Sequence, residues 1–220
     1  MSDLSIKDLM AKRVAEEVSN GDVINLGFGI PQKVVNFIPD NITAFIHAEN
    51  GVFGAGPAAE KGKEDGDLVD SGCMPITTVP GVSYFDSADS FALVRSGTLD
   101  MTVLGAFEVA ENGDLANWMI PGGLVPGMGG AMDLARHAKK VIVVTTHTDK
   151  KGNSKLKKKC GLPLTAKSCV SLIVTDIGVV EVTPDGYLLK ELFEGHTVDE
   201  AIEKTEGQLK VVDNPRVIKY

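Results

Sequence analysis

The run Val141-Ile142-Val143-Val144-Thr145 constrains the fold more than any other segment of the chain. A strand with one face in water alternates apolar and polar residues, whereas this run is apolar until its final threonine. Such a strand has both faces covered, which is typical of the inner strands of a parallel sheet. The run therefore predicts an α/β fold in which helices cover both faces of the sheet.

The rest of the chain alternates in the same way between helical and strand patterns. Ser5 and Asp8 form a capping-box pattern in front of a helix with apolar residues at helical spacing. We expect one domain over residues 1–220, with an open, mostly parallel sheet, a polar surface excursion at residues 58–72 and a C-terminal tail at about 206–220. Helices are predicted near residues 6–18, 31–38, 86–96, 131–138 and 198–206, and strands near 23–26, 42–47, 76–79, 99–105, 141–145, 171–175, 179–182 and 186–190.

Composition excludes several classes of protein. Lys plus Arg is 22 against 30 for Asp plus Glu, a net charge of −8, which argues against a nucleic-acid binder. The three cysteines form no Cys-x-x-Cys pair and the four histidines have no metal-ligand spacing, so we expect no disulfide framework and no metal site. A polar start and the lack of a long apolar run predict a cytoplasmic protein without membrane contact.

Of the 24 glycines, ten gather in three clusters at residues 27–29, 51–56 and 122–130, each of which follows a predicted strand or precedes a predicted helix. Ligands of open α/β sheets bind at the carboxyl ends of strands, where glycine lets the backbone approach them. Gly27-Phe28-Gly29 resembles the start of a dinucleotide fingerprint, but Gln32 stands where the third glycine belongs. A tight strand-to-helix turn is the alternative interpretation.

Glu49 is the strongest candidate for chemistry, because it directly follows an apolar strand and precedes the turn-forming pair Asn50-Gly51. A carboxylate there, partly desolvated, suits a nucleophile or a base, although an exposed turn residue fits the position too. The glycines at 127–130 precede a predicted helix, so their amides suit a phosphate or an oxyanion, and a flexible loop is the alternative. Asp133 fits the dipole of that helix better than catalysis.

Residues 149–159 carry a dense group of lysines. The group fits either a solvated loop or a docking surface for a phosphorylated ligand, and in the second case charge reversal at Lys157 and Lys158 raises the KM for that ligand. The lysines are Lys150, Lys151, Lys155, Lys157, Lys158 and Lys159.

Three longer motifs occur in order: Glu49-Asn50-Gly51-Val52-Phe53-Gly54-Ala55-Gly56-Pro57, Gly113-Asp114-Leu115-Ala116-Asn117-Trp118 and Pro126-Gly127-Met128-Gly129-Gly130-Ala131-Met132-Asp133-Leu134. Together with Gly27-Phe28-Gly29-Ile30-Pro31 and Leu162-Pro163-Leu164-Thr165, they resemble the B (beta) subunit of the 3-oxoacid CoA-transferase family. The resemblance runs from about residue 6 to about residue 205. The family usually has serine before its catalytic glutamate, where this chain has Ala48.

The resemblance implies a ping-pong CoA-transferase in which Glu49 is the nucleophile that becomes a glutamyl-CoA thioester. It implies that the Gly130 amide belongs to the oxyanion hole, and that CoA is a substrate while no cofactor is permanently bound. It also implies a partner, the alpha (A) subunit, in a heterodimer or heterotetramer, and near inactivity of this chain alone. The implied acids are small: acetate, butyrate, acetoacetate or succinate. The implied substrate- and CoA-binding residues are Gly27, Gly29, Asn50, Gly51, Gly54, Gly127 and Gly129.

Two other hypotheses remain open on the residues alone. A sugar-phosphate isomerase, or a phosphate-ligand-binding protein, on a related α/β scaffold would use Glu49 as a base and the glycine loops for phosphate. A noncatalytic scaffold subunit would keep the glycines at 127–130 for packing and would not depend on Glu49.

Overall fold

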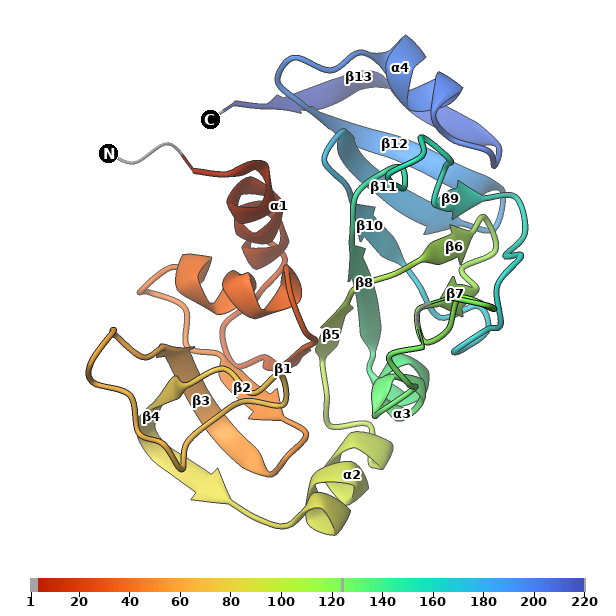
Figure 1. The fold of residues 1–220 in the computed structure, drawn as a ribbon. Coiled ribbons are helices and arrows are strands. Elements are labelled where there is room, and N and C mark those ends of the chain that lie inside the picture. The colour runs from red at the N-terminus through yellow and green to blue at the C-terminus, as the bar shows by residue number, and fades with distance from the viewer. Residues whose placement is uncertain (1–3, 124, 220) are drawn as a thin grey trace.

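The computed structural model describes residues 4–123 and 125–219. Its framework is a ten-stranded sheet in the order β13-β12-β11-β10-β8-β5-β1-β2-β3-β4 (Figure 1). The central strands are parallel to one another, as the sequence predicts for an α/β protein. These strands are β1 (Val23–Leu26), β2 (Phe45–Ala48), β5 (Met101–Leu104), β8 (Lys140–Val144) and β10 (Leu172–Val174).

Strand β8 confirms that both faces of the central sheet are covered. Val141 and Val143 belong to one core cluster, whereas Ile142 and Val144 belong to a second one. Because successive side chains of a strand point to opposite faces, the two clusters lie on opposite sides of the sheet. All four side chains are at most 2% exposed.

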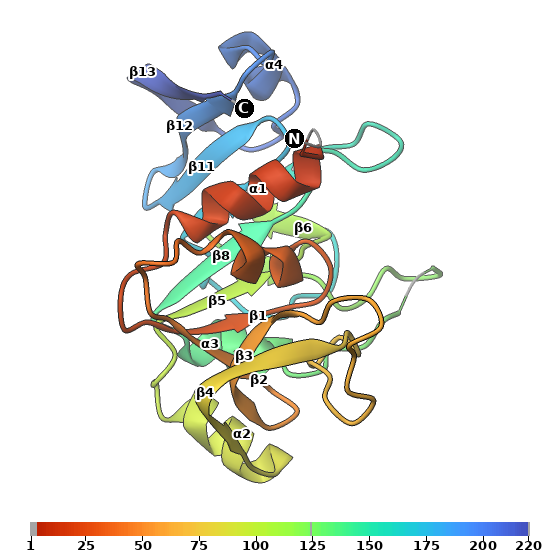
Figure 2. The ribbon, with the colours of Figure 1, turned by 90° about the vertical axis from the view of Figure 1, so that its left-hand side faces the viewer.

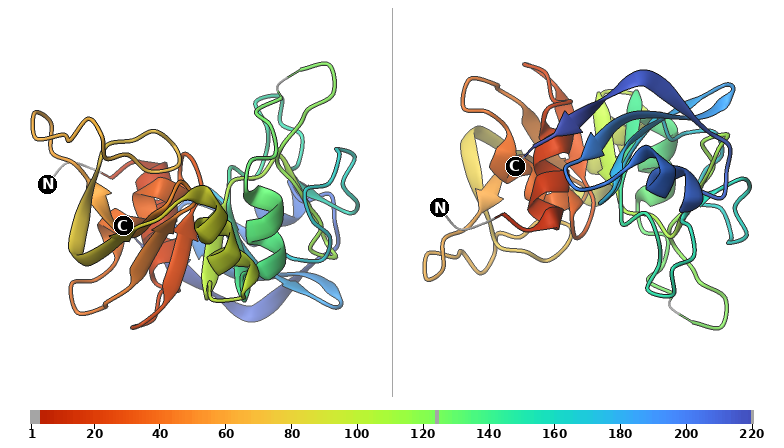
Figure 3. Two further views of the ribbon diagram at one scale, coloured as in Figure 1. Left: turned by 90° about the horizontal axis from the view of Figure 1, so that it is seen from below. Right: turned by 90° about the horizontal axis from the view of Figure 1, so that it is seen from above.

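Helices lie on each side of the central strands. Figure 2 shows α1 (Ile6–Ala15) and the 3₁₀ helix η1 (Pro31–Phe37) in front of β8, β5 and β1. The opposite face packs against α3 (Ala131–His137) and a small sheet of β6 (Glu108–Ala110), β7 (Leu115–Ala116) and β9 (Leu156–Lys157). Seen from below, α2 (Ser87–Arg95) lies beside α3 (Figure 3). The predicted capping box of Ser5 and Asp8 is present at the start of α1.

The edges of the large sheet contain antiparallel hairpins. Strands β2, β3 (Val52–Ala58) and β4 (Ile76–Tyr84) form one edge, and β10, β11 (Gly178–Thr183) and β12 (Gly186–Phe193) approach the other. The prediction that a strand ends at residue 79 is wrong, because β4 continues through Pro80 and Gly81. Proline lacks a backbone N–H, and an edge strand such as β4 tolerates that loss.

The prediction of a C-terminal tail is also wrong. After α4 (Val198–Glu203), residues Leu209–Ile218 form β13, which pairs in parallel with β12 and closes that edge of the sheet. The register shifts between Leu189 and Glu191, opposite the polar segment that contains Pro215. That segment interrupts the apolar pattern, which is why the strand is hard to recognise from the sequence.

No helix among the described residues has both the length and the apolar character needed to cross a bilayer.

Candidate active site

Glu49 stands at the tip of the hairpin between β2 and β3. Ala48 pairs with Val52, so residues 49–51 form a three-residue loop, closed by the Gly51 N–H, which donates to the Ala48 carbonyl at 2.9 Å. Gly51 has φ +108° and lies against the Phe85 carbonyl, with which any Cβ would overlap. Glycine is therefore required at residue 51, and the turn that carries Glu49 is narrowly defined.

The Glu49 side chain turns inward against the backbone of Gly130, the residue that precedes α3. Its Oε2 atom is buried and has no hydrogen-bond partner among the described residues. Burial raises the pKa of the Glu49 carboxyl, whereas the Gly130 N–H lowers it by hydrogen bonding, and burial is the larger effect. A carboxylate oxygen stripped of water and of hydrogen bonds is reactive, which suits a nucleophile or a base.

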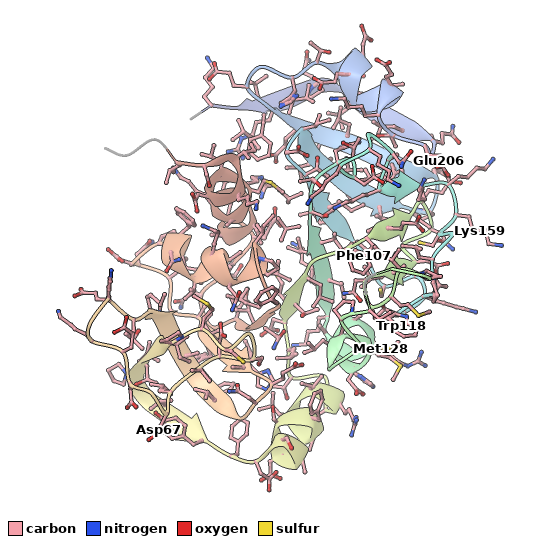
Figure 4. All side chains as sticks on the ribbon, in the orientation of Figure 1. Asp67, Phe107, Trp118, Met128, Lys159 and Glu206 are labelled. Carbon is pink, nitrogen blue, oxygen red and sulfur yellow. The ribbon has the colours of Figure 1, made fainter. Side chains whose placement is uncertain are left out.

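Glu49 opens onto a cavity of about 740 Å³ at the carboxyl ends of β1, β5 and β8. Five of the predicted site residues line it: Gly27, Glu49, Gly127, Gly129 and Gly130. Most of its remaining wall is apolar. The cavity is bordered by the loops after the three strands and by the segment in front of α3, where Figure 4 labels Phe107 and Met128.

A smaller hollow of about 460 Å³ lies on the other side of Glu49 and includes Asn50. The Asn50 Nδ2 donates to the Val69 carbonyl at 2.9 Å, so Asn50 holds the excursion at residues 58–72 beside the hairpin. In this hollow, Arg95 of α2 binds the Asp133 carboxylate through two hydrogen bonds of 2.9 and 3.1 Å. Asp133 lies in the first turn of α3, as predicted, and it also joins the two helices.

Three predicted site residues line neither hollow. Gly51 shapes the Glu49 turn, and Gly54, at φ +98°, lies in β3 close to the backbone of Val82. The Gly29 N–H donates to Gln32 Oε1 at 2.8 Å in the turn after β1. Their assignment to substrate or CoA binding stays a prediction.

Sequence reasoning missed Asn25, which lines the cavity from β1 and is 2% exposed. Its Nδ2 donates to the His47 carbonyl at 3.0 Å and faces His47 Nδ1 at 3.3 Å, and its Oδ1 accepts from Thr102 at 3.3 Å. Because Nδ1 accepts, Nε2 carries the proton and donates to Ser90 Oγ at 2.9 Å. An amide in the middle of an apolar strand is the signal that could have identified Asn25.

Asn117 is the second missed residue, although it lies within one of the three longer motifs. It lines the cavity, where its Nδ2 donates to the Gly105 carbonyl at 3.1 Å and its Oδ1 accepts from Thr165 at 2.6 Å. The neighbouring Trp118 indole donates to the Leu164 carbonyl at 3.3 Å, so it packs between loops. Both asparagines are held in fixed orientations at the cavity wall.

The lysine-rich segment is mostly turned to solvent. Lys157 forms an ion pair with Glu206 at 2.6 Å, and Lys158 and Lys159 are exposed (Figure 4). Lys155 differs from them, because it reaches the wall of the Glu49 cavity.

The remaining candidates for chemistry do not form a site. Among residues 4–123 and 125–219, no group of three or more His, Cys, Asp or Glu side chains could hold a metal ion. Burial raises the pKa of the Cys160 thiol to about 12 and that of Cys169 to about 11, so neither is a ready thiolate. Cys73 is a free, exposed thiol.

Comparison with known proteins identifies the family of the chain. Residues 7–204 match the model of the family described as coenzyme A transferase. A probable coenzyme A transferase beta subunit of Bacillus subtilis is 50% identical over 93% of this chain and 94% of its own length. The B subunit of the succinyl-CoA:3-ketoacid coenzyme A transferase of Helicobacter pylori is 47% identical over 94% of this chain and 99% of its own.

The fold recurs in a solved acyl-CoA transferase from Escherichia coli O157:H7. That structure superposes with a TM-score of 0.77 at 19% identity over 98% of this chain, which spans 44% of the length of the E. coli chain. At that identity the match shows the shared fold alone. The sequence matches establish that this chain belongs to the coenzyme A transferase family, and that the relatives it matches over nearly their full length are B or beta subunits.

Proposed function

We propose that this chain is the catalytic beta (B) subunit of a heteromeric CoA-transferase that exchanges CoA between a short-chain acyl-CoA and a carboxylic or 3-oxo acid. The observation that carries the proposal is the buried, unpartnered Glu49 Oε2, which faces the Gly130 backbone at the wall of a cavity in the described part of the chain. The names of the two bacterial relatives support the same reaction class.

In the proposed first half-reaction, a Glu49 carboxylate oxygen attacks the carbonyl carbon of the acyl-CoA thioester. The tetrahedral intermediate expels CoA as its thiolate and leaves a mixed anhydride of Glu49 and the acyl group. The thiolate then attacks the glutamyl carbonyl carbon, and the donor acid departs as its carboxylate. The product is a Glu49-CoA thioester, from which an acceptor acid takes CoA by the reverse steps.

Gly130 supports this chemistry in two ways. Its lack of a side chain lets the Glu49 carboxylate reach the backbone, and its N–H interacts with that carboxyl. In the proposed reaction the same N–H stabilises the negative charge that develops on the glutamyl oxygen when the thiolate attacks. One oxyanion-hole donor contributes about 3–4 kcal/mol to such reactions. We assign the remaining donor to the alpha subunit, with the two chains in a heterodimer or heterotetramer, so that this chain alone is nearly inactive.

For the acids, we propose succinate and a 3-oxo acid such as acetoacetate, as the name of the H. pylori relative suggests, with acetate and butyrate as further candidates. Ala48, which replaces the family's usual serine, is 5% exposed and belongs to the core cluster rather than to the cavity wall. The loss of that hydroxyl therefore alters the packing behind Glu49 more directly than the shape of the acyl pocket.

Trapping of the covalent intermediate tests the proposal. The chain is co-expressed with its alpha subunit, treated with acetoacetyl-CoA in the absence of an acceptor, reduced with borohydride and mapped by mass spectrometry. We expect reduction at Glu49 in the wild type and none in Glu49→Gln. An unmodified Glu49 peptide in a complex that binds CoA would instead favour isomerase or scaffold roles, and full activity of Glu49→Gln would favour the scaffold.

A further inference from the structure

Lys155 occupies an unusual position among the lysines of its segment. It lies just before β9, beyond the carboxyl end of β8, and lines the same cavity as Glu49. Lys7, which is exposed at the start of α1, is the other cationic residue on the cavity wall in the described part of the chain. Of these two lysines, Lys155 is the half-buried one, and Val144 and Phe107 line the same cavity.

Lys155 has no directly bonded anionic partner among the described residues. Burial lowers the pKa of its ammonium, and Asp176 and Asp149 oppose that shift from a distance. Its Nζ donates to Thr145 Oγ1 at 2.9 Å, and no described carboxylate accepts a hydrogen bond from it or forms an ion pair with it. The Thr145 hydroxyl donates to the Ala106 carbonyl at 3.0 Å, so its oxygen is available to accept from the ammonium. An ammonium has three N–H donors, and a buried cation normally has an anionic partner.

The main chain at Lys155 is fixed by hydrogen bonds on both sides of the peptide unit. The Lys155 N–H donates to the His147 carbonyl and its carbonyl accepts from the Val109 N–H, both at 2.9 Å. His147 is itself fixed, because its ring bonds to Thr175 and Thr205 at 3.0 and 2.9 Å. A cation on so rigid a support is preorganised for a ligand rather than free to sweep through solvent.

We propose that Lys155, oriented by Thr145, is an anion-binding residue of the Glu49 cavity that holds a carboxylate or phosphate group of the bound substrate. The inference rests on the proposed function in that it takes this cavity to be the place where acyl-CoA and acid bind. Two parts of the substrates can supply the anion: the second carboxylate of a dicarboxylic acid such as succinate, or a phosphate of CoA.

Steady-state kinetics of the complex with the alpha subunit test the inference with Lys155→Met, Lys155→Arg and the control Lys12→Met. Lys12 is an exposed lysine of α1 that does not line the cavity. We expect Lys155→Met to raise the KM of the anion-bearing substrate about 10- to 100-fold, the range of a charged hydrogen bond. Lys155→Arg should restore much of the affinity, and Lys12→Met should match the wild type.

The choice of substrates identifies the source of the anion. If Lys155 binds the acid, its loss raises the KM of succinate and leaves that of acetate unchanged. If it binds a phosphate, its loss raises the KM of acetoacetyl-CoA with either acid and leaves that of acetoacetyl-pantetheine, which has no phosphate, unchanged.

KM values for all four substrates within twofold of the wild type in Lys155→Met would overturn the inference. Thermal unfolding of each variant checks that its complex is folded. If the complex with Lys155→Met is not folded, Lys155→Gln is measured in its place. Borohydride trapping on the same preparations separates the two proposals. A Glu49 adduct with unchanged KM values means that only the Lys155 inference fails, and no adduct in the wild type means that the proposed function fails.

Discussion

The α-carbon of Gly130 lies so close to the Glu49 carboxylate that residue 130 has no room for a side chain while Glu49 keeps its present position. A Cβ at residue 130 would overlap Glu49 Oε2 and also crowd the ring of Phe91. Residue 130 is therefore constrained to glycine by its neighbour and not by its own backbone, whose φ of −82° suits any residue.

Gly130→Ala should consequently impair activity far more than stability. The new methyl group displaces the Glu49 carboxylate, and a misplacement of about 1 Å at a reacting centre costs about 100-fold in rate. The control is Gly66→Ala, because Gly66 has open space around its α-carbon and no positive φ. Comparison of kcat for both variants with the wild type checks this, and wild-type kcat in Gly130→Ala would contradict the described packing.

Glu49→Gln should abolish transfer and make the protein more stable at neutral pH. Burial raises the pKa of Glu49 above its ordinary value of 4.5, so the folded state disfavours its ionised form. This destabilisation is complete above the raised pKa, shrinks as the pH falls through it and vanishes below 4.5. Removal of the charge should raise the Tm by about 2–4 °C, which corresponds to about 1 kcal/mol.

Thermal unfolding at two pH values distinguishes this effect from a general change in packing. The Tm difference between Glu49→Gln and the wild type should be present at pH 7.5 and should shrink on acidification, when wild-type Glu49 is also neutral. A Tm that falls at pH 7.5, or a gain independent of pH, would contradict the assigned cause.

The central sheet and Glu49 were predictable because each has a local signal. An apolar run such as residues 141–145 identifies a strand with two covered faces, and a carboxylate directly after an apolar strand identifies the sharp turn at Glu49. By contrast, β13 has only a broken pattern and owes its place to pairing with β12. Its stability comes from a neighbour that local patterns do not show.

The same distinction applies to the cavity. The glycines at 127–130 were candidates because they precede a helix, and the family resemblance pointed to Gly130 among them, whereas Lys155 could not be separated from its neighbouring lysines by sequence. Its position depends on Thr145 and on the backbone of His147 and Val109, which come from other parts of the chain. Tertiary contacts, not residue type, set Lys155 apart.

Acid should destabilise the protein through its buried histidines. Burial lowers the pKa of His47 to about 4 and that of His147 to about 4, below the ordinary value of 6.5. Between pH 6.5 and 4 the two histidines therefore bind more protons in the unfolded chain than in the folded one. Their contribution to the free energy of unfolding is fully present above pH 6.5 and is lost as the pH drops to 4. Each histidine contributes a loss of about 3 kcal/mol over this window.

His47→Gln tests this linkage. The variant removes one titrating group, so the free energy of unfolding should fall less steeply between about pH 6 and 4.5, by about 1.4 kcal/mol per pH unit. Urea unfolding at several pH values measures the slope. An equal slope in the two proteins would show that His47 does not carry the acid sensitivity.

A buried ion pair joins the start of the chain to the far edge of the sheet. Arg13 of α1 binds Glu191 of β12 through two hydrogen bonds of 2.7 and 2.8 Å, and both residues are below 10% exposed. Arg13 also pairs with Glu17 at 2.7 Å. The pair thus holds α1 against the strands beyond β10.

Arg13→Met should destabilise the fold by up to about 3–5 kcal/mol, because it removes both hydrogen bonds to the buried Glu191 carboxylate and leaves it with only the longer ion pair to Arg216, at 3.9 Å. Adding Glu191→Leu to Arg13→Met should recover part of the loss, since an apolar pair replaces a buried charge that has lost its hydrogen-bonded partner. Lys63→Gln, which breaks the exposed pair with Glu60, should cost less than about 1 kcal/mol. Denaturant unfolding of the four proteins measures these differences, and a double variant that is less stable than Arg13→Met would show that the loss comes from packing rather than from the unpaired charge.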